Sequence, residues 1–151
     1  MSEKKFCYEY PRPAVTADIV LFGTKNNELF VLLIERGNDP FKGFWAFPGG
    51  FIDEDETIEA CAERELKEET SLEGISLEQF YTFSEPKRDP RHRTISVAFM
   101  AYINIDDYHP KAGDDAAKID WFPVNALPDL AFDHDKVLMK ALDVLETKAV
   151  I

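Results

Sequence analysis

The most constraining feature of the sequence is the segment Thr57–Thr70, which has helical periodicity but carries carboxylates on its apolar face. Thr57 is suited to cap a helix, and four apolar residues follow at helical spacing: Ile58, Cys61, Ala62 and Leu66. On a wheel of about 100° per residue, Glu65 and Glu69 fall within about 20° of the direction of Ile58, and Glu68 falls about 80° away. Three carboxylates are therefore expected to point inward or along the edge of the core.

These carboxylates need positive charge among them, because burying several of them unpaired is costly and each raises the pKa of its neighbours. Arg64, one turn before Glu68, can brace a carboxylate, but a single guanidinium cannot balance three. Mg²⁺ prefers carboxylate and carbonyl oxygens and usually shares its site with substrate phosphates. Gly49 and Gly50 permit a backbone turn that brings carbonyl oxygens toward such a metal or phosphate. The alternative is a surface helix rich in i,i+4 charge pairs.

The same region resembles the Nudix box, G-x5-E-x7-R-E-U-x-E-E-x-G-U, in which U is an aliphatic residue. The matching positions, at the same spacing throughout, are Gly50, Glu56, Arg64-Glu65-Leu66, Glu68-Glu69 and Leu72. Ser71 stands where the box has glycine, and that glycine shapes the helix exit rather than the metal site. The resemblance implies an α+β fold, an αβα sandwich with a mixed β-sheet between helices.

The resemblance also implies Mg²⁺ as the cofactor, with Mn²⁺ able to substitute for it. The implied ligands are the carboxylates of Glu65, Glu68 and Glu69 and the backbone carbonyl of Gly49. Glu56 and Arg64 would support these ligands as part of the catalytic machinery. The implied chemistry is substitution at phosphorus by water, in which the metal neutralises phosphate oxygens and helps to generate hydroxide.

Several carboxylates are candidates for the general base that accepts a proton from the attacking water. Glu65 or Glu69 is one choice. Among relatives a downstream acidic residue sometimes takes this part, and Asp114 and Asp115 are the candidates in this chain.

Short segments outside the box resemble the ADP-ribose pyrophosphatase branch of the family. They are Arg36, Pro40-Phe41-Lys42-Gly43, Trp45, Arg88-Asp-Pro-Arg91, Arg93, Gly113-Asp-Asp-Ala116 and Leu130-Ala-Phe-Asp-His134. The substrate-binding residues that this implies are Arg36, Trp45, Arg88, Arg91, Arg93 and Asp115. The implied reaction is hydrolysis of the pyrophosphate bond of a nucleoside diphosphate derivative, above all ADP-ribose to AMP and ribose 5-phosphate.

Two other functions are compatible with the resemblance. One is pyrophosphohydrolysis of a nucleoside triphosphate, including an oxidised deoxynucleotide, which the same metal helix would serve. The other is a non-catalytic ADP-ribose-sensing module, because this branch also resembles the Nudix half of bacterial NAD-metabolism repressors, whose catalytic carboxylates are altered. Here the carboxylates are all present, which favours the enzyme.

A basic loop gives independent support for a phosphate-containing substrate. Four of the 17 Lys and Arg residues lie within seven positions: Lys87, Arg88, Arg91 and Arg93. Guanidinium groups match phosphate oxygens bidentately, so the loop is expected to hold the diphosphate or to reach across a dimer interface toward the distal ribose. The alternative is a solvated connection, or salt bridges to the acidic surface.

Two other residues also have two interpretations each. Trp45 either stacks on adenine or packs in the core. His134 either takes part in the chemistry or caps a helix together with Asp133.

Composition limits the class of protein. A chain of 151 residues with 45% hydrophobic residues is enough for one core, so we expect a single domain over residues 1–151 with its core at about 10–147. The net charge of −12 repels nucleic-acid backbones. No apolar run approaches the roughly 18 residues of a membrane span, and no signal core is present, so a cytoplasmic protein is expected. A homodimer is expected from the resemblance alone.

Local patterns predict the remaining elements. A hairpin is expected from strands at Val15–Phe22 and Leu29–Ile34 around a turn at Gly23–Asn27. Further strands are expected at Gln79–Phe83, Thr94–Ile105 and Ile119–Phe122. A last helix is expected to begin at the cap residue Asp133.

Overall fold

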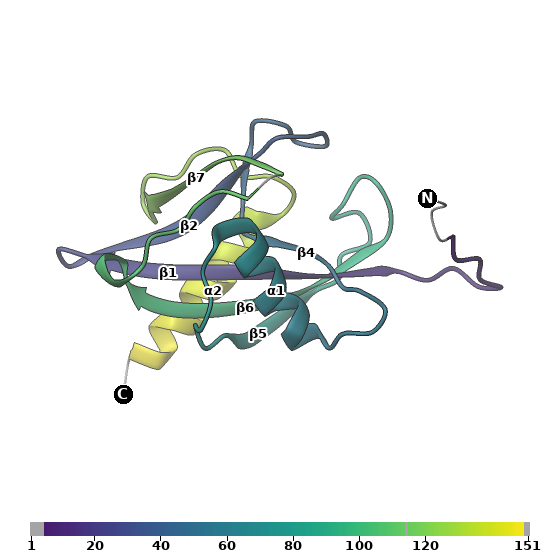
Figure 1. Cartoon of the computed structure of the whole chain (residues 1–151), viewed down its shortest axis with the longest axis horizontal. Coiled ribbons are helices and arrows are strands. Elements are labelled where there is room, and N and C mark those ends of the chain that lie inside the picture. Colours follow the sequence, from purple (N-terminus) through teal and green to yellow (C-terminus); the bar gives the residue numbers. More distant parts are fainter. Residues whose placement is uncertain (1–4, 114, 150–151) are drawn as a thin grey trace.

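The structure is a computed structural model that describes residues 5–113 and 115–149. Its strands are β1 (Ala14–Lys25), β2 (Glu28–Arg36), β3 (Trp45–Ala46), β4 (Gly49–Phe51), β5 (Glu78–Phe83), β6 (Thr94–Asn104) and β7 (Ala116–Pro123). The helices are α1 (Ile58–Thr70), α2 (His134–Ala149) and a short 3₁₀ helix (Ile105–Asp107). Helices α1 and α2 cover opposite faces of one sheet (Figure 1), which confirms the expected αβα sandwich.

Strand β1 is the centre of the sheet, in the path β3-β2-β1-β6-β5. It is parallel to β6 and antiparallel to β2 and β4, so the sheet is mixed, as expected. Successive side chains of a strand point to opposite faces. Ile19 and Leu21 therefore pack in the core beneath α1, whereas Val20 and Phe22 pack in the core beneath α2. Because helices cover both faces, β1 reads as an almost continuous apolar run.

The hairpin between β1 and β2 is confirmed, but the expected turn at Gly23–Asn27 is too long. The loop consists of Asn26 and Asn27 alone, with φ angles of 53° and 63°. Two residues with positive φ match the twist of a tight hairpin, and asparagine tolerates that conformation. Gly23 instead lies within β1, where a Cβ atom would come within 2.6 Å of the Ile105 side chain and 2.9 Å of the Trp121 side chain.

Other boundaries also differ from the expectation. Strand β7 is longer than predicted, and Ile105 leaves β6 to begin the 3₁₀ helix. Strand β4 was expected to be only a turn; it pairs with β1 from Thr16 to Asp18. Helix α2 follows Asp133, but the carboxylate of Asp133 accepts hydrogen bonds from Arg88 at 3.0 and 2.7 Å instead of capping the helix. Within the described residues, no helix is long and apolar enough to cross a membrane.

Helix α1 forms where its sequence predicts. The hydroxyl of Thr57 accepts a hydrogen bond from the backbone N–H of Ala60 at 3.1 Å. The helix ends at Ser71, which adopts the left-handed conformation with φ 65° while its N–H donates to the carbonyl of Lys67 at 2.8 Å. This is the position at which the Nudix box has glycine. An L-residue with a side chain pays a steric penalty there that glycine avoids.

Replacing Ser71 with glycine should therefore stabilise the protein. The free energy of unfolding of Ser71→Gly, measured by urea denaturation, should rise by about 1 kcal/mol. Ser76→Gly is the matched control, because Ser76 is also exposed but is not among the positive-φ residues. That control should lose up to about 1 kcal/mol through the added freedom of the unfolded chain. The same shift in both variants would contradict this explanation.

Candidate active site

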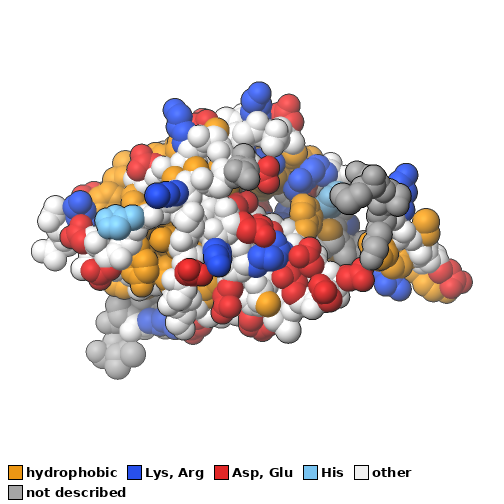
Figure 2. All heavy atoms as spheres, viewed as in Figure 1, with side chains coloured by type: hydrophobic (Ala, Val, Ile, Leu, Met, Phe, Trp, Pro, Cys, Tyr) orange, Lys and Arg blue, Asp and Glu red, His pale blue; other side chains and the backbone are white. Residues whose placement is uncertain are grey.

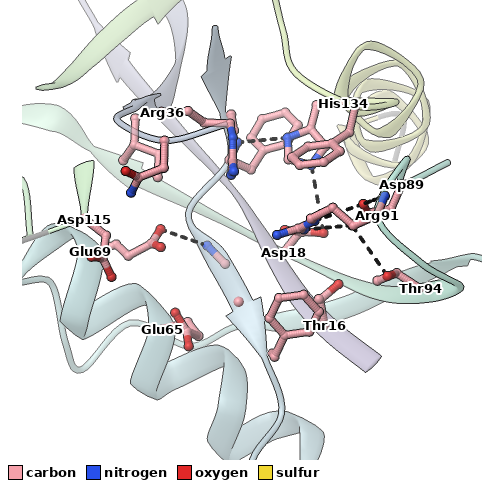
Figure 3. A pocket seen from close by; sticks show the side chains of 18 of the residues that line it. Thr16, Asp18, Arg36, Glu65, Glu69, Asp89, Arg91, Thr94, Asp115 and His134 are labelled. Carbon is pink, nitrogen blue, oxygen red and sulfur yellow. Dashed lines mark hydrogen bonds and ion pairs between the residues drawn. The ribbon is translucent and has the colours of Figure 1, made fainter. Parts of the chain in front are cut away.

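A cleft of about 510 Å³ brings together residues that are far apart in the sequence (Figure 3). Asp18 comes from β1, Arg36 from the end of β2 and Glu69 from α1, while Asp89 lies in the loop before β6 and His134 begins α2. Figure 2 shows acidic side chains gathered over the face that carries α1, with Lys and Arg between them. The cleft itself divides into an acidic wall, which contains Glu65, Glu69 and Asp115, and a basic wall, which contains Arg36 and Arg91.

The acidic wall depends on two glycines of β4. A Cβ atom on Gly50 would lie 2.4 Å from the carboxylate carbon of Glu65, and one on Gly49 would lie 2.3 Å from the carbonyl oxygen of Ala17. The N–H of Gly49 donates to Glu69 Oε2 at 3.1 Å. Neither glycine is among the residues with positive φ. The expected role of these glycines in a backbone turn is therefore wrong, since they are needed for close packing of β4 against β1 and α1.

Arg64 holds the supporting carboxylates in place. It donates to Glu56 from Nε at 2.9 Å and from Nη2 at 2.6 Å. Its Nη1 reaches Glu65 at 2.7 Å and Glu68 at 3.2 Å. Hydrogen bonds from Arg64 and from the backbone N–H of Asp53 lower the pKa of Glu56 to about 2, so Glu56 is a fixed negative charge.

Glu68 was expected to point inward or along the edge of the core, and its side chain lies on the solvent side of that edge. Its side chain is 57% exposed, and it is not among the residues that line the cleft. Its offset of about 80° on the helical wheel carries it past the edge of the core into solvent. Arg64 pairs with it there, so Glu65 and Glu69 are the two carboxylates of α1 that face the cleft.

In the acidic wall, the negative charge of the carboxylates is greater than the positive charge of the protein groups nearby. Burial raises the pKa of Glu69 to about 8, with further contributions from Glu65, Asp18 and Asp115. Burial also raises the pKa of Glu65, against the opposing effect of Arg64. Asp115 is brought to this wall by the preceding loop, in which the N–H of Gly113 donates to the carbonyl of Glu69 at 3.0 Å.

Oxygen donors crowded in this way suit a hard divalent cation. In the described part of the chain, however, no three His, Cys, Asp or Glu side chains already stand together as a metal-binding group. Glu65 and Glu68 are turned toward Arg64, and Glu69 is turned toward the N–H of Gly49. The donor set therefore fits a divalent cation in its chemistry.

Arg36 and Arg91 form the basic wall. Burial lowers the pKa of Arg36, and the charge of Arg91 lowers it further. The guanidinium of Arg91 is held by the carboxylate of Asp89, with nitrogen–oxygen distances of 3.0 and 2.7 Å. Both guanidinium groups lie over the ring of Phe132, at 4.9 Å for Arg36 and 5.5 Å for Arg91. Phe132 has a φ of 51°, a strained conformation that turns its ring into the cleft lining.

The other expected substrate-binding residues occupy different surroundings. The Arg88 side chain lines the cleft but is only 4% exposed and is bound to Asp133. Arg93 donates to the carbonyl of Ser84 at 2.8 Å and is not part of the cleft lining. Trp45 packs edge-on against Phe122 in the core, which favours the structural alternative for this residue.

Asp114 lies outside the residues that the structure describes. Asp18 and His134 are among the cleft residues that were not singled out as site residues from the sequence. Asp18 is a buried acid within the apolar run of β1, and that interruption of the run is the signal that could have identified it. His134 was considered in the sequence chiefly as part of a helix cap. It is instead a buried imidazole whose Nδ1 accepts the N–H of Phe47 at 3.1 Å.

Comparison with known proteins gives consistent matches. The family profile of the NUDIX domain matches residues 12–141. The chain is 43% identical over 129 residues to an ADP-ribose pyrophosphatase of Methanocaldococcus jannaschii, covering 85% of this chain and 73% of that protein.

A second group of relatives consists of regulators. The chain is 38% identical over 144 residues to an ADPR-responsive transcriptional repressor, NtrR, of Acinetobacter baylyi, and it spans 57% of the length of that repressor. Its fold also matches the NUDIX domain of Shewanella oneidensis NrtR in complex with ADP-ribose. That match has a TM-score of 0.81 and 33% identity, and it covers 90% of each chain.

The raised pKa of Glu69 predicts how stability depends on pH in the absence of metal. With a folded-state pKa of about 8 against an ordinary value of 4.5, the folded protein binds a proton that the unfolded chain releases. This contribution to stability is fully present below about pH 4.5 and is lost as the pH rises through about 8. In EDTA, Glu69→Gln should therefore flatten the fall in melting temperature across this range.

Glu63→Gln is the matched control for that measurement, because Glu63 lies on the exposed face of the same helix. It should retain the pH dependence of the wild-type protein. If Glu69→Gln and wild type lost stability in parallel as the pH rose, the acidic wall would not be the source of the effect.

Proposed function

The chain belongs to the Nudix family, and we propose that it is a hydrolase that depends on a divalent metal. Its proposed reaction is the cleavage of ADP-ribose to AMP and ribose 5-phosphate. The observation that carries the proposal is the cleft, which two carboxylates of α1, Glu65 and Glu69, line together with the guanidinium groups of Arg36 and Arg91. The 43% identity to an ADP-ribose pyrophosphatase supports the choice of substrate.

We assign the metal, Mg²⁺ or in its place Mn²⁺, to Glu65, Glu69 and the carbonyl of Gly49, with Glu68 joining from the outer edge of α1. Such a metal, when bound, neutralises phosphate oxygens and lowers the pKa of a bound water. Arg64 supports the assignment, since it anchors Glu56 and Glu65 to one another.

The protein's own groups would then carry out two tasks. Arg91 and Arg36 hold the diphosphate against the acidic wall, because guanidinium groups bind phosphate oxygens strongly. A carboxylate of Glu65, Glu69 or Asp115 accepts the proton of the attacking water. The oxygen of that water forms a bond to phosphorus as the bond from this phosphorus to the bridging oxygen breaks, so that each product keeps one phosphate.

Within the basic loop we assign substrate contact to Arg91 rather than to Arg88. The Arg91 side chain is 36% exposed and lies in the cleft, where Asp89 orients its guanidinium. Arg88 donates two hydrogen bonds to Asp133, just before α2, and its side chain is only 4% exposed, against 36% for Arg91. Arg88 therefore holds the loop in place, and Arg91 contacts the substrate.

A regulatory module that binds ADP-ribose without cleaving it is the second candidate. The similarity to a repressor that responds to ADPR favours it. The two functions differ in turnover, so one assay separates them. The protein and Mg²⁺ should be incubated with ADP-ribose, NADH, dinucleoside polyphosphates and nucleoside triphosphates. AMP and ribose 5-phosphate as the main products identify the enzyme; binding of ADP-ribose with no products identifies the sensor.

The single-domain organisation, the homodimer and the cytoplasmic location stay predictions.

The metal assignment predicts the effect of charge removal on α1. Glu65→Gln and Glu69→Gln should each lower kcat by at least about 10²-fold, the low end for a positioned acid–base group, while both variants remain folded. The same change at the exposed Glu63 should be nearly silent. Activity within threefold of wild type in both cleft variants would rule out this assignment.

The two arginines of the loop should behave differently when replaced. Arg91→Ala should lower kcat/KM for ADP-ribose roughly 10- to 150-fold, the effect of one charge-assisted hydrogen bond, with a smaller effect on any triphosphate. Arg88→Ala breaks a buried ion pair and should cost about 3 to 5 kcal/mol of stability, with little change in kcat/KM of the folded fraction. Equal losses of kcat/KM in two equally stable variants would refute the division of roles.

A further inference from the structure

A chain of buried polar groups lies at the lining of the cleft, and Figure 3 shows two of its members, His134 and Asp18. His134, only 3% exposed, accepts the N–H of Phe47 at Nδ1, with a distance of 3.1 Å. Its Nε2 lies 4.0 Å from Oδ2 of Asp18, and that same oxygen accepts a hydrogen bond from the hydroxyl of Ser96. The four residues come from the β3–β4 connection, α2, β1 and β6, so this group of residues joins two strands and a strand connection to a helix.

The hydrogen bonds define the form of the imidazole. A ring nitrogen that accepts an N–H carries no proton, so the proton of the neutral His134 ring is on Nε2 and points toward Asp18. Burial lowers the pKa of His134, which keeps the ring neutral. The ring also stacks on Phe47, with centroids 5.1 Å apart and an interplanar angle of 26°. Its orientation is thus fixed by two polar contacts and one aromatic contact.

The polar residues His134 and Asp18 support the backbone segment that leads to the acidic wall. The carbonyl of Pro48 accepts the N–H of Ile19 at 2.8 Å, and the N–H of Gly49 donates to Glu69 at 3.1 Å. Asp18 is the partner of Gly49 in the register of β1 and β4, and its Oδ1 would lie 2.4 Å from a Cβ atom on that glycine. The segment from Phe47 to Gly49 therefore rests directly on His134 and Asp18.

We propose that His134 is a positioning residue for metal binding: by holding the N–H of Phe47 and facing Asp18, it sets where the backbone of Gly49 lies relative to Glu69. The inference rests on the proposed function only in taking Gly49, Glu65 and Glu69 as metal ligands. His134 touches neither the metal nor the substrate in this role. Partners that orient ligands in this way typically change metal affinity about 10- to 100-fold when they are lost.

Two substitutions separate the two contacts of the ring. The side-chain oxygen of asparagine stands as far from Cβ as Nδ1 does, so His134→Asn retains an acceptor for Phe47. The side-chain nitrogen of glutamine stands as far from Cβ as Nε2 does, so His134→Gln retains a donor toward Asp18 but loses the acceptor. Mn²⁺ affinity should be measured for each variant by following free Mn²⁺ with electron paramagnetic resonance, without any nucleotide.

The proposal predicts about tenfold or greater weakening of Mn²⁺ binding in His134→Gln and at most about a threefold change in His134→Asn. Val137→Ala is the control for a loss of packing alone, because Val137 is fully buried one turn further along α2. It should lower the melting temperature without changing Mn²⁺ affinity. Ser96→Ala, which removes one partner of Asp18, should weaken Mn²⁺ binding about tenfold, beyond the threefold change allowed for His134→Asn, and decides the matter if His134→Gln does not fold.

Wild-type affinity in His134→Gln, or in Ser96→Ala if that variant has to decide, would overturn the inference. So would equal weakening in His134→Gln and His134→Asn, or weakening in Val137→Ala as large as that in His134→Gln. Failure of the wild-type protein to bind Mn²⁺ is a different result. It would overturn the metal assignment of the proposed function, and this inference would fall with it.

Discussion

The structure of the cleft depends on the close approach of a glycine backbone to the carboxylates of α1. Gly50 lies against Glu65 with no room for a Cβ atom, and Gly49 lies against β1 while its N–H binds Glu69. This contact closes the gap between the centre of the sheet and the helix that covers it. It also brings two carboxylates into one small volume at a large electrostatic cost. Burial in this volume raises the pKa of Glu69, and the charge of Glu65 raises it further.

The division of the cleft into two walls follows from this cost. Arg64 is shared among Glu56, Glu65 and Glu68, so it offsets only part of the negative charge of the acidic wall. On the other side, Arg36 and Arg91 are held near each other over Phe132 in spite of their like charge. A cation at one wall and a diphosphate at the other would relieve both kinds of repulsion. The same ligands would then gain affinity from interactions that the protein alone leaves unfavourable.

Helix α2 contributes to the site although it lies on the far face of the sheet from α1. Its first residue, His134, supports Phe47, and the preceding Asp133 anchors the basic loop through Arg88. Asp89, next in the loop, orients Arg91. The start of α2 is thus a common support for the segment that leads to the acidic wall and for the loop that supplies the basic wall.

The sequence by itself determined the helix from Thr57 to Thr70, the two strands of the first hairpin and the two carboxylates that face the cleft. These features have a local cause, since helical and strand periodicity and capping depend on neighbouring residues. The direction of Glu68 was at the limit of this reasoning, because a residue at the edge of a helical face is exposed or buried according to what packs beside it. Strand β4 has no periodicity of its own and exists only because β1 offers a partner.

Only the tertiary structure decided which arginine of the loop keeps a partly exposed guanidinium in the cleft, and that Asp18 and His134 belong to the cleft. Arg88 and Arg91 are equivalent in the sequence, and their surroundings differ because Asp133, 45 residues beyond Arg88, binds the first and Asp89 binds the second. His134 meets Phe47 across 87 residues of sequence. Such pairings arise when the sheet brings distant segments together, and composition, spacing and periodicity carry no information on which partner each polar group will find.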